Sequence, residues 1–174
     1  MLALVSGGSA SGKSRFAEDL AAGRSAGTRI YVATMQVWDE ESRRRVARHR
    51  AMRAGKGFAT VERPLDLERL EVPAGSTVLL EDLPNLAANE WFGGAERRAS
   101  ARERILSGVE RLKARTALTV VVANELFSDG IDYEEETAAY LDMLARLDRA
   151  IAREADEVYE VVCGIPVCWK GGGR

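Results

Sequence analysis

The sequence predicts an α/β domain built on a mainly parallel β-sheet with helices on both faces. Apolar, often β-branched runs alternate along the chain with amphipathic or charged helical stretches, which is the pattern of βαβ units. Strand, helix and strand follow one another within residues 1–34, and such a unit implies parallel strands with a right-handed crossover. A glycine-rich loop between that first strand and helix is the third observation, and it indicates where a ligand binds.

The loop follows a short apolar strand, residues 2–6, and matches the phosphate-binding pattern G-x-x-x-x-G-K-[ST] without a mismatch. Its members are Gly7, Gly8, Ser9, Ala10, Ser11, Gly12, Lys13 and Ser14. The glycines let backbone N–H groups surround a polyphosphate, Lys13 can reach the β- and γ-phosphates, and the Ser14 hydroxyl can ligate Mg²⁺. The amphipathic helix that follows points its positive N-terminal end at the anion. We therefore expect a P-loop NTPase-type fold, rather than a glycine-rich turn with an incidental lysine.

Composition sets limits on the class of protein. With 174 residues, 46% of them hydrophobic, the chain can bury the core of one domain, expected at residues 1–170 with a disordered tail at 171–174. The net charge of −2 gives no bulk attraction to nucleic acid or to an anionic membrane. Cys163, Cys168 and a single histidine fit neither a disulfide framework nor a zinc site. The chain starts on its first strand and contains no run as long as a membrane span, so we expect a cytoplasmic protein without membrane insertion.

The second expected strand, residues 29–34, is mostly apolar and should be buried on both faces. A charged helical stretch begins at residue 40, where Arg45, His49 and Arg53 recur at intervals of four and place the only histidine between two arginines on one face. A solvated basic helix accounts for this pattern. A neutral imidazole that attacks phosphorus, with arginines holding the phosphate oxygens, also accounts for it. Composition alone does not choose between them.

The middle of the chain supplies candidate acids. Residues 58–62 form a short expected strand, a helix is expected at 65–70, and an apolar strand at 76–82 ends on Glu81 and Asp82. Beside a phosphate loop, a strand-end acid holds the water shell of Mg²⁺ or activates the acceptor, and Glu81 or Asp82 fits either role. Acids also end strands without any catalytic role, so that alternative stays open.

The C-terminal half continues the α/β pattern. Residues 85–92 lead into a charged helix at 96–115, whose inner face is marked by Ile105, Val109 and Leu112. The β-branched run at 116–123 predicts a central strand that ends on Asn124 and Glu125. A long helix is expected at 133–153, and residues 155–170 contain two short strands that turn at Gly164 and can add an antiparallel edge.

Several segments together carry a resemblance. GGSASGKS, YVATMQVWDEESRRRVARHR, TVLLED with Asn89 after it, VVVANE and ADEVYEVVCGIPVCWK occur in this order along nearly the whole chain. They resemble the bifunctional adenosylcobinamide kinase/adenosylcobinamide-phosphate guanylyltransferase family of cobalamin biosynthesis. The second and last segments are more specific than the phosphate loop. The resemblance is weaker at residues 126–150, where only Asp142 remains of the family's polar helix signature, and Pro84 and Asn85 stand where the family usually has a threonine.

The resemblance implies two reactions. ATP or GTP phosphorylates the aminopropanol hydroxyl of adenosylcobinamide, and GMP from GTP is then moved onto that phosphate through a guanylyl-histidine. By the same resemblance His49, Lys13 and Glu81 are catalytic, Ser14 and Glu81 hold Mg²⁺, and the protein is a homotrimer. The nucleotide-binding residues are implied to be residues 7–14 together with Arg45, Arg53, Glu62 and Glu81.

Two other classes of function stay open. A small-metabolite kinase would need Lys13, Ser14 and Glu81 but not His49, and a nucleotide-binding protein without turnover would tolerate loss of the acids. The intact phosphate loop and Glu81 argue against the second class. His49, inside its matching segment, argues against the first.

Overall fold

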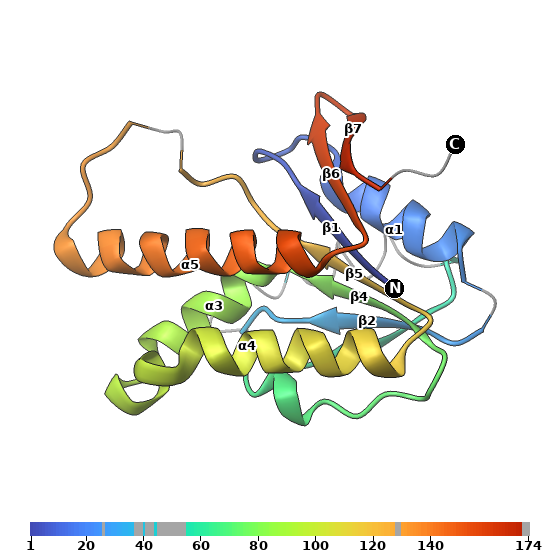
Figure 1. Ribbon diagram of the computed structural model, residues 1–174, viewed down its shortest axis with the longest axis horizontal. Helices are drawn as coiled ribbons and strands as arrows, with labels where there is room; N and C mark the ends of the chain where they lie inside the picture. Colours follow the sequence, from blue (N-terminus) through green and yellow to red (C-terminus); the bar gives the residue numbers. More distant parts are fainter. Residues whose placement is uncertain (26, 37–39, 41–43, 45–54, 128–129, 172–174) are drawn as a thin grey trace.

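The computed structural model describes residues 1–25, 27–36, 40, 44, 55–127 and 130–171 (Figure 1). Within this part of the chain, seven strands form one sheet in the order β3-β2-β4-β5-β1-β6-β7. The strands are β1 (Leu2–Ser6), β2 (Arg29–Ala33), β3 (Phe58–Glu62), β4 (Thr77–Glu81), β5 (Leu118–Val122), β6 (Glu157–Val162) and β7 (Ile165–Lys170). Neighbouring strands are parallel except β6 and β7, which form an antiparallel hairpin at one edge. The predicted mainly parallel sheet and its antiparallel edge are confirmed.

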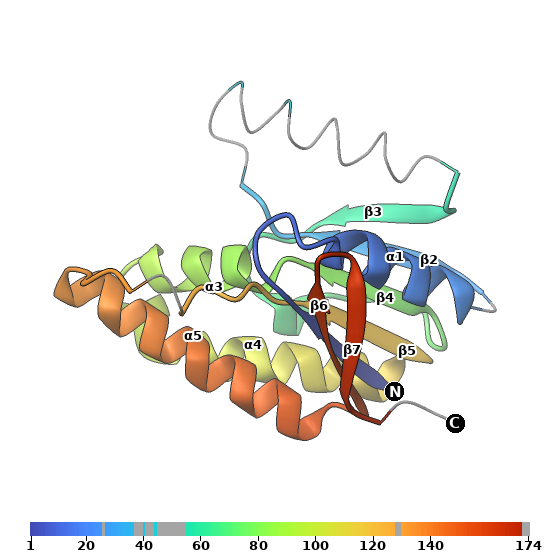
Figure 2. The same ribbon diagram turned by 90° about the horizontal axis from the view of Figure 1, so that it is seen from above.

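Helices cover both faces of this sheet, as predicted. They are α1 (Lys13–Gly23), α3 (Leu83–Phe92), α4 (Ala95–Arg115) and α5 (Glu135–Glu154), with one 3₁₀ turn, η1 (Leu67–Arg69). Figure 2 shows α1 on one side of the sheet and α3, α4 and α5 together on the other. Alternate residues of β1 serve the two sides: Ala3 and Val5 pack in the cluster under α1, while Leu2 and Leu4 join the larger core under α4 and α5. Both faces of the central strands are therefore apolar and buried.

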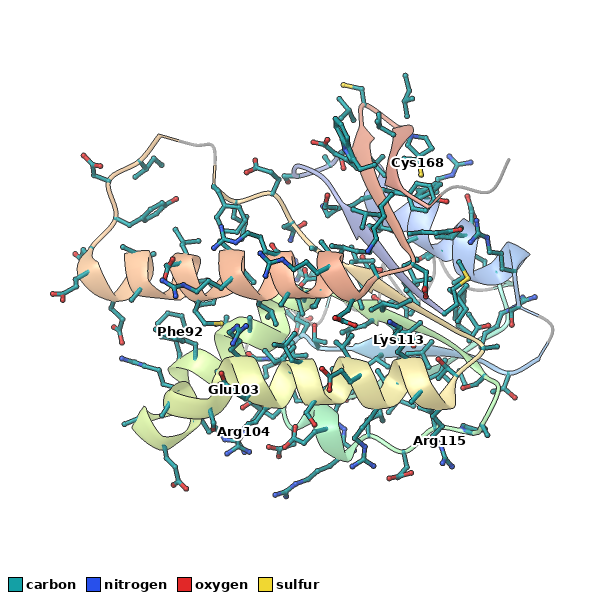
Figure 3. All side chains as sticks on the ribbon, viewed as in Figure 1. Phe92, Glu103, Arg104, Lys113, Arg115 and Cys168 are labelled. Carbon is teal, nitrogen blue, oxygen red and sulfur yellow. The ribbon has the colours of Figure 1, made fainter. Side chains whose placement is uncertain are left out.

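Helix α4 has the inner face that the sequence predicts, and α5 packs beside it. Ile105, Val109 and Leu112 of α4 are buried in the larger core, and α5 adds Leu144 and Leu147. In Figure 3, Phe92 points from the end of α3 toward α5, where its ring centroid lies 5.5 Å from that of Tyr140. None of the helices in the described part of the chain is long and apolar enough to cross a bilayer.

The helix expected at 65–70 is a wrong prediction, because only the single 3₁₀ turn η1 forms there. Asp66, the residue before it, has a left-handed φ of 53°, which no α-helix accommodates. Its backbone N–H donates to Glu90 Oε1 at 2.7 Å, and its carboxylate accepts from Arg97 at 2.9 Å. Long-range polar contacts with α3 and α4 therefore take the place of helical hydrogen bonds.

Helix α3 is not among the predicted elements, since residues 85–92 are expected only to lead into the next helix. Its start nevertheless has a sequence signature: the Asp82 side chain accepts the Asn85 N–H at 2.8 Å as an N-cap, and Pro84 occupies the first turn. The other boundaries differ by one or two residues, as at α5, which begins at Glu135 rather than at residue 133.

The carboxylates of Asp66, Glu68 and Glu90 lie within 4.8 Å of one another. Arginines neutralise the cluster: Arg97 contacts Asp66 and Glu90 at 2.9 Å, and Arg104 lies 3.6 Å from Asp66 and 3.5 Å from Glu68. Glu90 is fully buried. The cluster therefore holds α3, α4 and η1 together as an ion-pair network.

Arg97→Met is expected to lower the free energy of unfolding by about 3–5 kcal/mol, because it leaves the buried Glu90 carboxylate without its charged partner. Urea unfolding followed by circular dichroism measures the change. Arg111→Met is the matched control on the same helix, since Arg111 pairs at 3.0 Å with exposed Glu71 and should cost less than about 1 kcal/mol. Equal effects of the two substitutions would contradict this account.

Candidate active site

The predicted phosphate loop lies between β1 and α1, at the carboxyl edge of the sheet (Figure 1). Two of its glycines are required by geometry. A Cβ at Gly7 would lie 2.6 Å from the Val161 carbonyl oxygen, and Gly12, with φ of 92°, caps α1 where a Cβ would lie 3.3 Å from Gly164 Cα. No side chain caps the start of α1, so its first N–H groups face the loop. This is the arrangement that binds an anion at a helix N-terminus.

Neighbouring strands hold the loop from both sides. The Glu125 N–H, just after β5, donates to the Gly7 carbonyl at 3.1 Å, and the Gly164 N–H, in the turn between β6 and β7, donates to the Ser11 carbonyl at 2.8 Å. The turn predicted at Gly164 is confirmed, but its contact with the loop is not predictable from the sequence pattern. Backbone pairing between residues more than 150 positions apart leaves no local signal, although the glycine itself marked a special position.

Lys13 is the first residue of α1 and is only 8% exposed. Its ammonium donates to the Gly8 carbonyl at 3.1 Å, which keeps it over the loop. Burial lowers the pKa of this ammonium, while the carboxylates of Asp82 and Glu81 act on the pKa in the opposite direction. The structure thus brings the predicted lysine and the strand-end acids into one electrostatic site.

Glu81 ends β4 and is 9% exposed, and Asp82 follows as the N-cap of α3. Thr34, fully buried just after β2, fixes this turn: its hydroxyl donates to the Asp82 carbonyl at 2.8 Å and accepts the Asp82 N–H at 2.9 Å. The Thr34 N–H also donates to the Glu81 carbonyl at 3.2 Å. Asp82 therefore caps α3, which makes Glu81 the candidate acid for chemistry. This role of Thr34 is not predicted from the sequence.

Glu62, another predicted nucleotide contact, ends β3 on the same edge. Its register partner on β2 is Ala33, which pairs with Glu81 on the other side, so the two glutamates end strands flanking β2. Asn89 of α3 links the segments that follow β2 and β3. Its side-chain amide donates to the Thr34 carbonyl at 2.9 Å and to the Pro64 carbonyl at 3.0 Å.

The histidine segment falls mostly outside the described residues. Glu40 and Arg44 are described and helical, with Arg44 Nε 3.9 Å from Glu40 Oε1. Arg45, His49 and Arg53 lie outside the described residues, as do residues 172–174 of the predicted tail.

The donors around the loop fit a nucleotide and its magnesium ion. Ser11 Oγ is buried and has no hydrogen-bond partner in the described part of the chain, so it can donate to a phosphate oxygen. The hydroxyl of Ser14 and the carboxylate of Glu81 are oxygen ligands of the kind that Mg²⁺ prefers. The loop, Lys13 and Glu81 can therefore bind a nucleoside triphosphate and neutralise the charge that its transfer develops.

One further titratable group lies close to the loop and was not predicted. Asp148 of α5 lines a cavity that also contacts Ser6, the residue before the loop. Burial raises the pKa of the Asp148 carboxyl to about 7. The hydrophobic periodicity of α5 does not predict that this side chain is buried, because the burial depends on the loop after β5.

Asp148→Asn is expected to raise the free energy of unfolding at pH 8 by about 2–4 kcal/mol and to change it little at pH 4. The folded-state pKa of about 7 lies above the ordinary value of 3.8, so the stability at low pH is fully present below pH 3.8 and is lost as pH rises through the folded-state pKa. Urea unfolding at the two pH values measures the difference. Asp142→Asn, which removes an exposed carboxylate paired with Arg146, is the control. A pH-independent effect of Asp148→Asn would refute the assignment.

Comparisons with known proteins bear on this site. The family model for cobinamide kinase / cobinamide phosphate guanyltransferase matches residues 3–169. The bifunctional adenosylcobalamin biosynthesis protein CobP of Pseudomonas aeruginosa is 35% identical over 173 residues, covering 97% of this chain and 96% of that protein. The bifunctional protein CobU of Escherichia coli K12 is 34% identical over 183 residues, covering 96% of this chain and 98% of that protein.

Among solved structures, the flagellar accessory protein FlaH from Methanocaldococcus jannaschii superposes with a TM-score of 0.53 at 12% identity, covering 98% of this chain and 78% of that one. At that identity the likeness concerns the fold alone, and it agrees with the predicted α/β architecture.

Proposed function

Because this chain belongs to the cobinamide kinase / cobinamide phosphate guanyltransferase family, we propose that its loop at residues 7–14 serves both of that family's reactions. The protein is a kinase and a nucleotidyltransferase of cobalamin biosynthesis. The observation that carries the proposal is geometric: Lys13, whose ammonium donates to the Gly8 carbonyl at 3.1 Å, and Glu81, which ends β4, lie at the same edge of the sheet. A single phosphate-binding loop beside the Glu81 carboxylate suits both phosphoryl transfer and guanylyl transfer.

In the kinase step, the phosphate loop binds the triphosphate of ATP or GTP and Lys13 neutralises charge on the transferred phosphoryl group. The aminopropanol hydroxyl of adenosylcobinamide attacks the γ-phosphorus, the bond to the β-phosphate oxygen breaks, and the nucleoside diphosphate leaves. Glu81 accepts the hydroxyl proton or holds the magnesium water shell. Mg²⁺, held by Ser14 and Glu81, would supply further charge neutralisation between the phosphates.

In the guanylyl step, a neutral imidazole nitrogen of His49 attacks the α-phosphorus of GTP and pyrophosphate leaves. A phosphate oxygen of adenosylcobinamide phosphate then attacks the same phosphorus and the P–N bond breaks, which returns the free histidine. Arg45 and Arg53 hold phosphate oxygens during both displacements, and Glu62 binds the nucleotide. The family resemblance of segment 31–50 supports the roles of Arg45 and His49, which lie outside the described part of the chain, as does Arg53.

The proposal extends to assembly and location. We infer a homotrimer in which the His49 segment of one protomer meets the phosphate loop of the next. Exposed apolar side chains on β7, at Ile165, Val167 and Trp169, support an interface between copies. A cytoplasmic location accords with a pathway that consumes GTP and ATP. Light scattering at several protein concentrations tests the trimer.

Product analysis tests the proposed function. The protein with adenosylcobinamide, Mg²⁺ and ATP alone should yield adenosylcobinamide phosphate and stop, whereas GTP should yield the phosphate and then the GDP-linked corrinoid. Mass spectrometry of chromatographically separated corrinoids identifies both products. Nucleotide hydrolysis without any modified corrinoid would contradict the proposal.

A further inference from the structure

A cavity of about 240 Å³ lies between α5 and the carboxyl ends of β1 and β5. Ser6, which precedes Gly7, and Asn124, which follows β5, bring it to the base of the phosphate loop, while Asp148 and Ala152 close it from α5. The walls are mainly apolar. The cavity is therefore a small, largely apolar recess next to the site of phosphoryl transfer.

Asp148 gives this recess a polar end. Its Oδ1 is buried and has no hydrogen-bond partner among the residues that the structure describes. The other charged side chains that line the cavity are Glu125 and Arg149. A buried carboxyl oxygen without a partner is costly to a fold, and native proteins seldom keep one that has no donor in the functional complex.

A second hollow, of about 420 Å³, adjoins the first across Phe127. It runs along α5 and is lined on its other side by residues 126–127 and 130–133. Its apolar wall includes Leu126, Ile131 and Tyr133, and Ile131 is 60% exposed. Exposed large apolar side chains gathered along one groove indicate a binding surface.

We propose that the recess at Asp148 receives one primary-amide arm of the corrinoid acceptor, with the Asp148 carboxyl accepting the amide N–H, while the adjoining apolar groove packs against the macrocycle. The inference rests on the proposed function. A corrinoid carries methyl groups and several short methylene arms that end in primary amides. Such an arm fits the recess, since its apolar stem would meet the apolar walls and its amide head would meet the buried Asp148 Oδ1.

The nucleotide is a poorer occupant of this recess. The predicted nucleotide contacts Glu62 and Glu81 end β3 and β4, which lie on the side of β5 away from β1, whereas the recess lies at β5 and β1 beside α5. In-line transfer also places acceptor and leaving group on opposite sides of the phosphorus. An amide arm pairs with Asp148 whether the carboxyl is neutral or ionised, and its pKa of about 7 makes both forms present at neutral pH. A guanine edge, which offers two donors, needs the ionised form.

The test compares wild type with Asp148→Leu and with Ala152→Phe, which fills the recess without touching the carboxyl. Equilibrium dialysis with adenosylcobinamide, read by corrinoid absorbance, gives the dissociation constant, and steady-state assays give the KM for acceptor and for GTP. Each variant should raise the acceptor dissociation constant and KM about tenfold or more. The KM for GTP and the yield of protein-bound GMP from GTP alone should stay unchanged. Glu154→Leu, on the same helix but outside the recess, is the control.

Each other outcome overturns the inference. Unchanged acceptor binding in both variants, with wild type active, removes the amide subsite and leaves the proposed function intact. A rise in the KM for GTP alone would assign the recess to the nucleotide base. Wild type that neither binds nor modifies the corrinoid would overturn the proposed function as well.

Discussion

Lys13→Met is expected to slow both phosphorylation of the corrinoid and formation of the protein-bound GMP by at least about 10²–10³-fold. The ammonium is held over the loop by its contact with Gly8 at 3.1 Å and lies beside Glu81 and Asp82. Methionine keeps an unbranched apolar stem of nearly the same length but removes the charge. Because we assign both reactions to one phosphate loop, one substitution should affect both.

Single-turnover assays with GTP, with and without adenosylcobinamide, measure the two rates separately. Lys113→Met is the matched control, because Lys113 lies on α4, across the sheet from α1 (Figures 2 and 3), and its ammonium donates to the Glu154 carbonyl at 2.6 Å. Wild-type guanylylation in Lys13→Met, with phosphorylation lost, would mean that the two reactions use separate phosphate sites.

Glu81→Gln is expected to lower the rate of the kinase step by roughly 10²–10⁴-fold. Glu81 ends β4 at 9% exposure, and Thr34 fixes the backbone on its C-terminal side. Glutamine preserves the shape of the side chain, but it neither takes up a proton nor offers a charged ligand. The substitution therefore removes proton acceptance and charged metal ligation, while a side chain of the same shape still occupies the site.

The dependence of this loss on magnesium separates the two roles considered for Glu81. If the carboxylate positions the metal, raising the Mg²⁺ concentration should recover part of the rate. If it accepts the acceptor's proton, the loss should persist at every Mg²⁺ concentration and the acid limb of the pH profile should disappear. Glu154→Gln is the control, and a near wild-type rate in Glu81→Gln would exclude both roles.

Features of the fold with a local signature could be predicted from the sequence. The strand at residues 2–6 and the loop after it were predicted at the observed positions, because hydrophobicity and the spacing of Gly7, Gly12 and Lys13 are both local. The helix expected at 65–70 failed because Asp66 is held by Glu90 and Arg97, which come from other elements. Tertiary contacts there outweigh local propensity.

The site was predicted in part for the same reason. Lys13 and Glu81 follow from motif and strand ends, and the structure brings them together through the order β4-β5-β1. The buried hydroxyl of Thr34 and the contact between Gly164 and Ser11 depend on which strands become neighbours. Asp148 acquires its perturbed pKa from a cavity that only the folded chain creates.

The most direct test of the bifunctional account is the intact mass of the protein after incubation with GTP and Mg²⁺, for wild type and His49→Ala. Wild type should gain one GMP through an acid-labile, base-stable bond, and His49→Ala should gain none while it still phosphorylates adenosylcobinamide. No adduct in wild type, or an adduct that survives in His49→Ala, would contradict the guanylyl-histidine mechanism.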